Sequence, residues 1–546
     1  MNIAQAKEQI KNAMTAYFTK NEFGDYKIPV EKQRPVLLIG PPGIGKTAIM
    51  EQIASELGVG LVSYSMTHHT RQSALGLPFI TTDEFEGMEY RLSEYTMSEI
   101  IGSIYKLMKE TDVREGILFL DEINCVSETL APCMLQFLQY KVFGQHRIPK
   151  GWIVVTAGNP PEYNKSVREF DIVTWDRLKR IDVEPDYESW KKYASMKNIH
   201  PAILTYLSAR KKDFYKIEST VDGRHFVTAR GWEDLSEMIR LYEENGITVD
   251  ENLISQYIQH TKTSKDFAIY YDLFRKYRSD YKIDAILAGD PGEDVIFRAT
   301  RAPLDERLSF LGMLFDAVAA ELREVCEKED LMDALLPILK EMKAEMTEGA
   351  ENAAPGSIDR TLSPAEGSGV PAGNKKPSPA EGSDVPAEDR KLSPAEIIDL
   401  HIDAEVEKLE KGKKSFSLSA AQQKVIQRVL MSLHSYKAEV LGSGTADAEE
   451  AFGLIRAAFQ KQAKELSESA GEAGRKLDAA LKFCEKAFGD GDEILIFITE
   501  LTVNYFTARF IGHYGCDRYF IHNKELQFSQ RQTELDRRVQ ELTWEV

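Results

Sequence analysis

Two patterns of hydrophobic and polar residues follow each other in the first part of the chain. Up to about Pro185, short apolar runs typical of β-strands alternate with helical patterns, which indicates an α/β fold. The expected strands are Pro35–Gly40, Gly60–Ser65, Gly116–Asp121 and Gly151–Ala157. From Tyr187 to about Met346 the apolar residues recur at three-to-four spacing, as in Ala302–Lys340, so this part is expected to be mainly helical.

A change in composition interrupts the helical pattern. Residues 347–396 are rich in Ala, Pro, Gly, Ser and Glu, and they contain a short repeat, LSPAEGSGVPAGNKK, PSPAEGSDVPAEDRK and the start of a third copy. Such a segment cannot bury enough apolar surface to offset its ordering entropy, so it is predicted to be a disordered linker. Helical periods resume over Ala420–Tyr436, Ala448–Phe488 and Leu526–Leu542, and they predict a C-terminal all-α domain.

Composition narrows the classes of function. A chain of 546 residues is too long for one domain. Its 87 acidic and 68 basic side chains give a net charge of −19. This balance argues against a broad basic surface, so a nucleic-acid partner is not expected.

Three features of the sequence indicate where in the cell the protein is expected. The N-terminus lacks the apolar core of a signal peptide. The most apolar run, Ile494–Gly512, contains Glu500 and Arg509, so it is predicted to be a buried helix rather than a membrane span. The five cysteines are widely spaced and form no CxxC pair, and therefore a reducing cytoplasm is expected.

A glycine-rich motif follows the first predicted strand and opens the helical pattern Lys46–Leu57. Its residues are Gly40, Pro41, Pro42, Gly43, Ile44, Gly45, Lys46 and Thr47, which fit G-x-x-x-x-G-K-[ST]. Glycines let backbone N–H groups turn around phosphate oxygens, and the helix N-terminus adds a positive dipole end. Lys46 is expected to reach the β- and γ-phosphates of ATP, and the Thr47 hydroxyl is expected to bind Mg²⁺.

The third predicted strand ends in two carboxylates, Asp121 and Glu122. Its continuous apolar run is typical of the centre of a parallel sheet. Asp121 is expected to hold Mg²⁺ through the water shell of the ion, and Glu122 to polarise the attacking water as general base. Strand ends are also often acidic for solubility, so the pair alone would be weak evidence of a catalytic site. The glycine-rich motif that precedes it in the chain supports the catalytic interpretation.

Three further residues are candidates for the same site. Asn159 follows the fourth strand and can bond the attacking water or the γ-phosphate, or it can cap a turn before two prolines. Arg177 is preferred over Arg180 as an arginine finger from a neighbouring subunit, and a surface ion pair is the alternative. Arg230 begins an amphipathic helix, and it either reports the γ-phosphate from a second domain or is an exposed arginine at a helix start.

The order of these motifs resembles the AAA+ ATPases, and specifically their MoxR-like branch. The motifs are GPPGIGKT, LFLDE, TAGNPPEYN, WDRLKR and TARGWEDLS, and the resemblance covers about residues 1–290. It implies a P-loop αβα core, a helical lid, nucleotide at subunit interfaces, and a ring that is usually hexameric. By position it implies these roles: Walker A for Lys46 and Thr47, Walker B for Asp121 and Glu122, sensor 1 for Asn159, arginine finger for Arg177 and sensor 2 for Arg230.

MoxR-like proteins act as chaperone-like remodellers, commonly with a partner that carries a von Willebrand factor A domain, and some relatives help to load metals or cofactors. The resemblance therefore implies a Mg²⁺-dependent ATPase that remodels a protein client. The alternative is a nucleotide-gated scaffold, in which the linker and the C-terminal helices bind a client and turnover is incidental. A DNA-directed motor is disfavoured by the negative charge.

Five ranges follow from these patterns: a nucleotide-binding core at 1–185, a helical lid at 186–285, a helical extension at 286–346, the linker at 347–396 and the C-terminal helical domain at 397–546. One segment of the core, Thr67–Tyr95, is long and poorly patterned. It contains a candidate hairpin around Gly87, which is interpreted as a surface hairpin rather than a partner contact.

Overall fold

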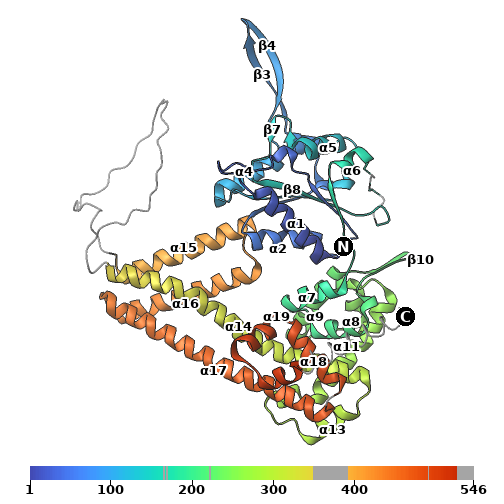
Figure 1. Ribbon diagram of the computed structural model, residues 1–546, viewed down its shortest axis with the longest axis vertical. Coiled ribbons are helices and arrows are strands. Elements are labelled where there is room, and N and C mark those ends of the chain that lie inside the picture. Colours follow the sequence, from blue (N-terminus) through green and yellow to red (C-terminus); the bar gives the residue numbers. More distant parts are fainter. Residues whose placement is uncertain (164–165, 168–169, 221–222, 349–391, 490, 525–546) are drawn as a thin grey trace, which may run out of the picture. The chain divides into compact units, whose positions relative to one another are not determined.

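The computed structural model describes residues 1–163, 166–167, 170–220, 223–348, 392–489 and 491–524 (Figure 1). Most of the predicted linker and the helical period Leu526–Leu542 lie outside these residues. The chain divides into two compact units. Unit 1 comprises residues 1–329, 408–424 and 466–546, and unit 2 comprises residues 330–407 and 425–465. The five ranges expected from the sequence stay predictions.

A five-stranded parallel sheet forms the centre of the N-terminal part of unit 1. Its order is β2-β5-β8-β1-β9, with β1 at Val36–Ile39, β2 at Gly60–Ser65, β5 at Gly116–Asp121, β8 at Trp152–Gly158 and β9 at Lys179–Asp182. The four predicted strands are confirmed. Edge strand β9 lies outside the prediction because only Ile181 of its four residues is buried, so it lacks the continuous apolar run of a central strand.

Helices cover both faces of this sheet. On one face, α1 (Ile3–Phe18) and α2 (Lys46–Leu57) pack against strand residues that include Phe119. On the other face, α4 (Glu99–Thr111) and α5 (Ala131–Tyr140) pack against residues that include Leu118. Successive strand residues point to opposite faces, so a strand between two helical layers is apolar throughout. The αβα architecture of the predicted fold class is confirmed.

A two-stranded ribbon is inserted between β2 and α4. It consists of β3 (Pro78–Phe85) and β4 (Met88–Tyr95), which are antiparallel and joined by a tight turn at Glu86 and Gly87. The candidate hairpin is therefore present, and Figure 1 shows it projecting beyond the sheet. Most of its side chains are exposed. Short elements complete this region: η1 (Val30–Lys32), η2 (Met66–His68), α3 (Arg71–Leu75), η3 (Ile123–Cys125), β6 (Val142–Phe143), β7 (His146–Arg147) and α6 (Ile172–Asp176).

A mainly helical region follows the sheet, as the spacing of apolar residues predicts. Its elements are α7 (Tyr187–Met196), α8 (Pro201–Ala209), η4 (Lys211–Asp213), β10 (Lys216–Thr220), β11 (Gly223–Val227), α9 (Ala229–Glu244), α10 (Glu251–Tyr257), α11 (Thr261–Tyr281), α12 (Ile283–Leu287) and α13 (Glu293–Arg301). Each helix from α7 to α11 starts at a residue whose side chain accepts a bond from a first-turn N–H. The aromatic rings of Trp232, Tyr206 and Phe267 pack together in its core. Below, the name lid is used for residues 187–301, a range that extends beyond the predicted lid at 186–285.

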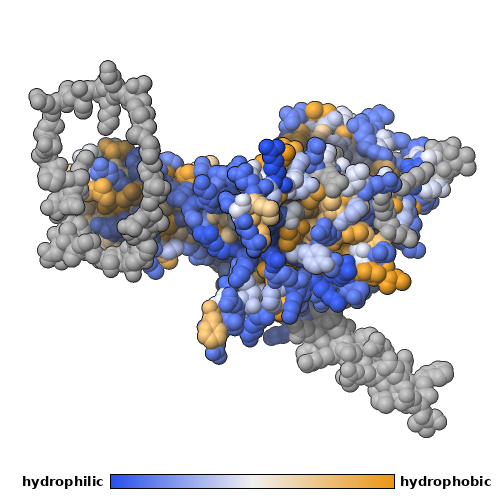
Figure 2. Space-filling model, turned by 90° about the horizontal axis from the view of Figure 1, so that it is seen from above, coloured by the Kyte–Doolittle hydropathy of each residue, from blue (hydrophilic) through white to orange (hydrophobic). Residues whose placement is uncertain are grey.

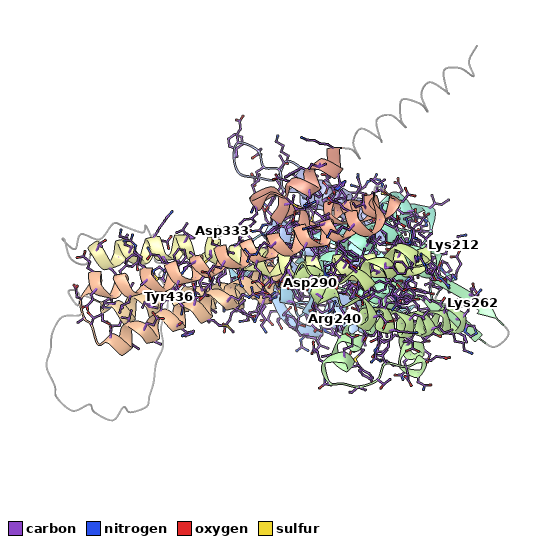
Figure 3. The ribbon with its side chains drawn as sticks, turned by 90° about the horizontal axis from the view of Figure 1, so that it is seen from below. Lys212, Arg240, Lys262, Asp290, Asp333 and Tyr436 are labelled. Atoms are coloured by element: carbon purple, nitrogen blue, oxygen red, sulfur yellow. The ribbon has the colours of Figure 1, made fainter. Side chains whose placement is uncertain are left out.

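Four long helices each contribute residues to both units: α14 (Leu304–Glu348), α15 (Pro394–Ser415), α16 (Ala420–Ser443) and α17 (Ala448–Phe488). Within unit 2 their apolar faces form one core around Leu335, Ile398, Leu433 and Tyr436. Tyr436 is labelled among these helices in Figure 3, and its hydroxyl donates to Gln462 Oε1 at 2.6 Å.

The predicted single helix at 494–512 is wrong in one respect, because two helices occupy this stretch. They are α18 (Asp492–Val503) and α19 (Tyr505–Tyr514), with a bend of 88° between them. Asn504 lies at the bend, where its side chain accepts hydrogen bonds from the first N–H groups of α19. In the described part of the chain, no one helix has the length and apolar content to cross a membrane; this bent pair reaches both limits only when its two helices are taken together.

Candidate active site

The glycine-rich loop joins the carboxyl end of β1 to the N-terminus of α2. Gly43 and Gly45 have φ values of 73° and 92°, a left-handed conformation that glycine adopts without a Cβ clash. Gly45 directly precedes Lys46, the first helical residue. The first N–H groups of a helix have no partner within it, so this end of α2 offers donors to an anion.

Lys46 is buried at the base of this loop, with 8% of its surface exposed. Its Nζ donates to the carbonyl oxygens of Gly40 at 2.7 Å and Pro41 at 2.9 Å, and to Asn159 Oδ1 at 2.9 Å. Burial lowers the pKa of the ammonium group to about 8; the nearby Asp121 carboxylate opposes the shift, and Arg230 adds to it. A buried cation held by three neutral acceptors is a site that would favour an anion.

Thr47 and Asp121 bring two oxygen ligands together. The Thr47 hydroxyl donates to Asp121 Oδ2 at 3.1 Å, and the N–H of Glu122 donates to Asp121 Oδ1 at 2.8 Å. Mg²⁺ prefers oxygen ligands and is usually held by one or two carboxylates together with substrate phosphates. The pair fits that ion, and no larger metal cluster of His, Cys, Asp and Glu exists among the described residues.

The Glu122 carboxylate has partners that the motif search did not identify. Its Oε2 accepts hydrogen bonds from Ser65 Oγ at 2.8 Å and from Thr67 Oγ1 at 2.9 Å. Ser65 is the last residue of β2 and lies opposite Asp121 in the parallel pairing of β2 with β5. No sequence motif points to Ser65. It could have been identified only from the order of the strands, because residues at the carboxyl ends of neighbouring parallel strands meet at one edge of the sheet.

Asn159 lies at the same edge, after β8. Its side chain accepts from Lys46, and its carbonyl oxygen accepts from Asn124 Nδ2 at 2.8 Å. Asn124 is buried, and a Cβ on Gly158 would lie 2.6 Å from its Oδ1. Because Gly158 has no side chain, Asn124 can lie close to it and bond the Asn159 carbonyl, which holds Asn159 in place. The sequence motifs did not identify Asn124 as part of the site.

The two candidate finger arginines have different surroundings. Arg180 donates to Asp182 Oδ1 at 2.8 Å, and its guanidinium lies 4.5 Å from the ring centre of Trp175. Arg177 caps the C-terminus of α6, where its N–H donates to the Thr174 carbonyl at 3.1 Å. Its side chain is exposed, and its guanidinium forms no hydrogen bond or ion pair with the described residues. Neither arginine lines the cavity formed by the glycine-rich loop and the lid. The structure therefore does not bring Arg177 to the site of its own chain.

Arg230 approaches the glycine-rich loop from the lid. Its N–H donates to the Gly43 carbonyl at 3.3 Å, and a Cβ on Gly43 would lie 2.9 Å from the Cβ of Thr228. The Tyr215 hydroxyl, also from the lid, donates to the Pro42 carbonyl at 2.8 Å. The lid contacts the loop directly, and only a residue without a side chain permits this distance at position 43.

Residues 42–47 of the glycine-rich loop line one cavity of about 780 Å³. Besides the glycine-rich loop, its walls include Asp121, Glu122, Asn159 and Arg230. The start of α1 and the lid close the other side, with residues Ile3, Trp190, Tyr193, Met196 and Phe214. Cavities of this size that combine apolar walls with a few converging polar groups are typical of small-molecule sites.

Comparison with known families agrees with this geometry. Residues 36–168 match the model of the ATPase family associated with various cellular activities (AAA). This part of the chain is an AAA ATPase domain. The family implies that the domain binds nucleotide. The matched residues contain the glycine-rich loop, the acidic pair and Asn159, whereas Arg177 and Arg230 of the candidate site lie beyond the AAA match.

Three solved structures that match the chain cover less than half of it, with low sequence identities and low TM-scores. A Cytophaga hutchinsonii protein named as a candidate ATPase is 14% identical with a TM-score of 0.23, over 36% of this chain and 51% of that chain. The chain thus spans about half of the length of that protein. Two variants of Thermotoga maritima RuvB are 16% and 17% identical, both with TM-scores of 0.26, over 47% and 46% of this chain and 69% of theirs. No curated protein matches the sequence significantly.

Proposed function

We propose that the protein is a Mg²⁺-dependent ATPase that assembles into a ring and uses ATP hydrolysis to remodel a partner protein. One observation carries the proposal. Lys46, Thr47, Asp121 and Asn159 come from three separate strand ends and meet at one cavity, which Arg230 approaches from the lid. In parallel α/β sheets, ligands bind outside the carboxyl ends of the strands, and this is where the four residues lie.

Each residue has a task that its position supports. Backbone N–H groups of the glycine-rich loop and the Lys46 ammonium would hold the phosphates, and Thr47 and Asp121 would hold Mg²⁺. The bound ion neutralises charge on the phosphate oxygens. Glu122 would accept the proton of the attacking water, after its carboxylate leaves the hydroxyls of Ser65 and Thr67. Asn159 would orient the γ-phosphate or the water.

We assign to Arg177 the role of the arginine finger that one copy of the chain supplies to the active site of its neighbour. Its exposed guanidinium has no bonded partner in the described part of the chain, whereas Arg180 is held by Asp182 and Trp175. An arginine that reaches the γ-phosphate of a neighbouring copy stabilises charge in the transition state. Ring assembly is part of the proposal, with six copies as the MoxR-like resemblance implies. It is supported by the position of Arg177, which does not line the cavity of its own chain.

The nature of the client rests on the resemblance of the motifs. A protein client and a partner with a von Willebrand factor A domain are the properties that the MoxR-like branch suggests, whereas a cytoplasmic location is expected from the spacing of the cysteines. Removal of the γ-phosphate would release the contacts of Asn159 and Arg230. The lid would then move relative to the sheet as a rigid body, and this movement would act on the client.

Substitution of the proposed base tests the chemistry. Glu122→Gln is expected to bind ATP as tightly as the parent, but to lose on the order of 100-fold or more in turnover, because the amide cannot accept the proton. Equilibrium binding of a fluorescent ATP analogue and phosphate release measure the two properties. Glu22→Gln, an exposed carboxylate outside the cavity, is the matched control and should leave both unchanged.

The arginine pair tests the trans site. Arg177→Ala is expected to lower turnover by about 10³-fold or more with ATP affinity unchanged, and Arg180→Ala is expected to have a much smaller effect. The reverse result would move the finger to Arg180. Turnover by Glu122→Gln at the parent rate would refute the assigned base, and ATP-dependent assembly of a parent protein without turnover would favour the nucleotide-gated scaffold.

A further inference from the structure

Helix α7 lines the nucleotide cavity with one face and contacts other helices of unit 1 with the opposite face. The first face carries Trp190, Tyr193 and Met196. Residues three and four apart share a helix face, so these side chains form one wall of the cavity. The opposite face carries Lys191 and Ser195, which are four apart and do not line the cavity. The contacts of these two residues show what holds the wall in position.

Two side chains from distant parts of the sequence bind the opposite face of α7. The Lys191 ammonium donates to Glu500 Oε1 of α18. Arg323 of α14 donates through Nη2 to the Ser195 carbonyl at 2.9 Å, and its guanidinium lies 4.8 Å from the ring centre of Phe506 in α19. The carbonyl groups in the last turn of a helix have no partner within it, and Arg323 provides a partner for one of them. Helices α14 and α18 are thus bonded to α7 behind the cavity wall.

The wall also shares a hydrophobic core with α18. Trp190 is 6% exposed and belongs to the same cluster of buried residues as Phe497, Ile498 and Leu501. Its indole N–H has no hydrogen-bond partner in the described part of the chain. Packing therefore fixes Trp190, and the position of the wall depends on the helices that pack behind it.

The Lys191–Glu500 pair differs from an ordinary ion pair on the surface. Hydrophilic side chains make up much of the surface in Figure 2, and a pair between two exposed side chains contributes little to stability. Lys191 and Glu500, in contrast, are only 18% and 30% exposed. Removal of one partner leaves the other partly buried and unpaired, which costs more than the loss of a solvated pair.

We propose that the Lys191–Glu500 pair and Arg323 set the position of the nucleotide-facing wall of α7, so that the C-terminal helices control how tightly the cavity binds ATP and ADP. The inference rests on the proposed function and adds residues that lie outside the AAA match. All three are positioning residues, because none of them lines the cavity. Coupling between two sites is reciprocal, so nucleotide binding also stabilises the contact of α7 with α18.

The effect is on nucleotide affinity rather than on turnover. The proposed base, Glu122, and the proposed Mg²⁺ ligands Thr47 and Asp121 lie at the carboxyl edge of the sheet, whereas the wall belongs to the lid. The wall carries none of the groups that act on the γ-phosphate. An interaction that is equal in the ground state and the transition state changes KM and leaves kcat unchanged.

Glu500→Gln tests the ion pair. It is expected to weaken ADP binding about three- to tenfold. KM for ATP should rise by the same factor, with kcat within about twofold of the parent. Isothermal titration calorimetry with ADP and Mg²⁺ measures the affinity, and steady-state phosphate release measures KM and kcat.

Glu188→Gln is the matched control. Glu188 also lies on α7, but it pairs with Lys211 of the lid at 2.6 Å, and both side chains are exposed. Loss of this solvated pair should change ADP affinity, KM and kcat by no more than about twofold.

Further variants separate positioning from a general loss of structure. Lys191→Glu combined with Glu500→Lys rebuilds the pair in reverse and should recover most of the lost affinity. Arg323→Gln removes the bond to the Ser195 carbonyl, and it should weaken ADP binding with the same division between KM and kcat. If the circular dichroism of Glu500→Gln differs from that of the parent, Lys191→Gln removes the same bond from its other end.

Hydrogen–deuterium exchange tests the reciprocal effect. ADP should slow exchange in α18 peptides of the parent, and it should do so less in Glu500→Gln. Exchange in α18 that ADP leaves unchanged would refute the coupling. If Glu500→Gln and Arg323→Gln bind ADP as the parent does, or lose turnover at unchanged affinity, the inference is wrong and the proposed function stands. A parent protein that neither binds ADP nor hydrolyses ATP would contradict the proposed function itself.

Discussion

The sheet and the β3–β4 ribbon are both built from strands rich in apolar residues, but they differ in what covers them. Phe119 in β5 is fully buried between helical layers, whereas Phe85 in β3 is 64% exposed. In the ribbon, the register places Phe79, Phe85 and Met88 on one face, with a mostly polar opposite face. The same residue type therefore contributes to a core in one region and remains on the surface in the other.

The difference also holds for charge. At the carboxyl edge of the sheet, the Lys46 ammonium is buried and bonded to three acceptors. Near the tip of the ribbon, Glu84 lies directly opposite Glu89, an unfavourable pairing of like charges that solvent screens. In the sheet, the buried charge of Lys46 is needed for the proposed function. In the ribbon, the exposed apolar side chains and the Glu84–Glu89 pair do not contribute to the stability of the ribbon itself.

The largest expected contrast is in stability. Phe119→Ala should destabilise the sheet by about 3–5 kcal/mol because it leaves a cavity in a packed core. Phe85→Ala should change stability by no more than about 0.5 kcal/mol, as is usual for exposed positions. Hydrogen–deuterium exchange of β5 and β8 peptides measures local opening in both variants. Comparable losses would show that the ribbon is covered in solution.

The buried charge should be visible in the pH dependence. Burial holds the pKa of Lys46 at about 8, against 10.5 for the unfolded chain, so the unfolded state binds more protons between these values. The cost of the buried charge is therefore fully present below pH 8 and disappears as the pH rises to 10.5. It is on the order of 3 kcal/mol for a shift of this size.

Lys46→Met is therefore expected to gain stability relative to the parent at pH 7 without nucleotide, and to lose that advantage by pH 10.5. Denaturant unfolding at several pH values measures the difference between the two proteins. Lys106→Met, at an exposed lysine, should show no such trend. A difference that stays constant with pH would mean that burial does not control the charge of Lys46.

The smallest effect is expected in the ribbon. Glu84→Lys replaces a like-charge pair with an attractive one opposite Glu89, and it should stabilise the ribbon by about 0.2–1 kcal/mol. Thr82→Lys is the reverse test, since it places a lysine opposite Arg91 and should destabilise by a similar amount. Amide exchange within β3 and β4 reports both. Equal exchange in both variants would show that these pairs do not interact.

Local motifs allowed much of the core to be predicted. The strands β1, β2, β5 and β8 and the helix α2 were accessible because a buried parallel strand is an uninterrupted apolar run and a glycine-rich turn precedes the helix. Strand β9 and the bend at Asn504 were not, because an edge strand needs little apolar sequence and a helix break can follow from a single capping residue.

The sequence by itself determined which chemical groups this protein has: a phosphate-binding loop, an acidic pair and arginines after the fourth predicted strand. Only the tertiary structure decided which of them meet. It placed Ser65 and Thr67 on Glu122, brought Asn159 to Lys46, and left Arg177 exposed and outside the cavity of its own chain. The physical reason is that motif chemistry is local along the chain, whereas these contacts depend on strand order and on helices packing over long sequence separations.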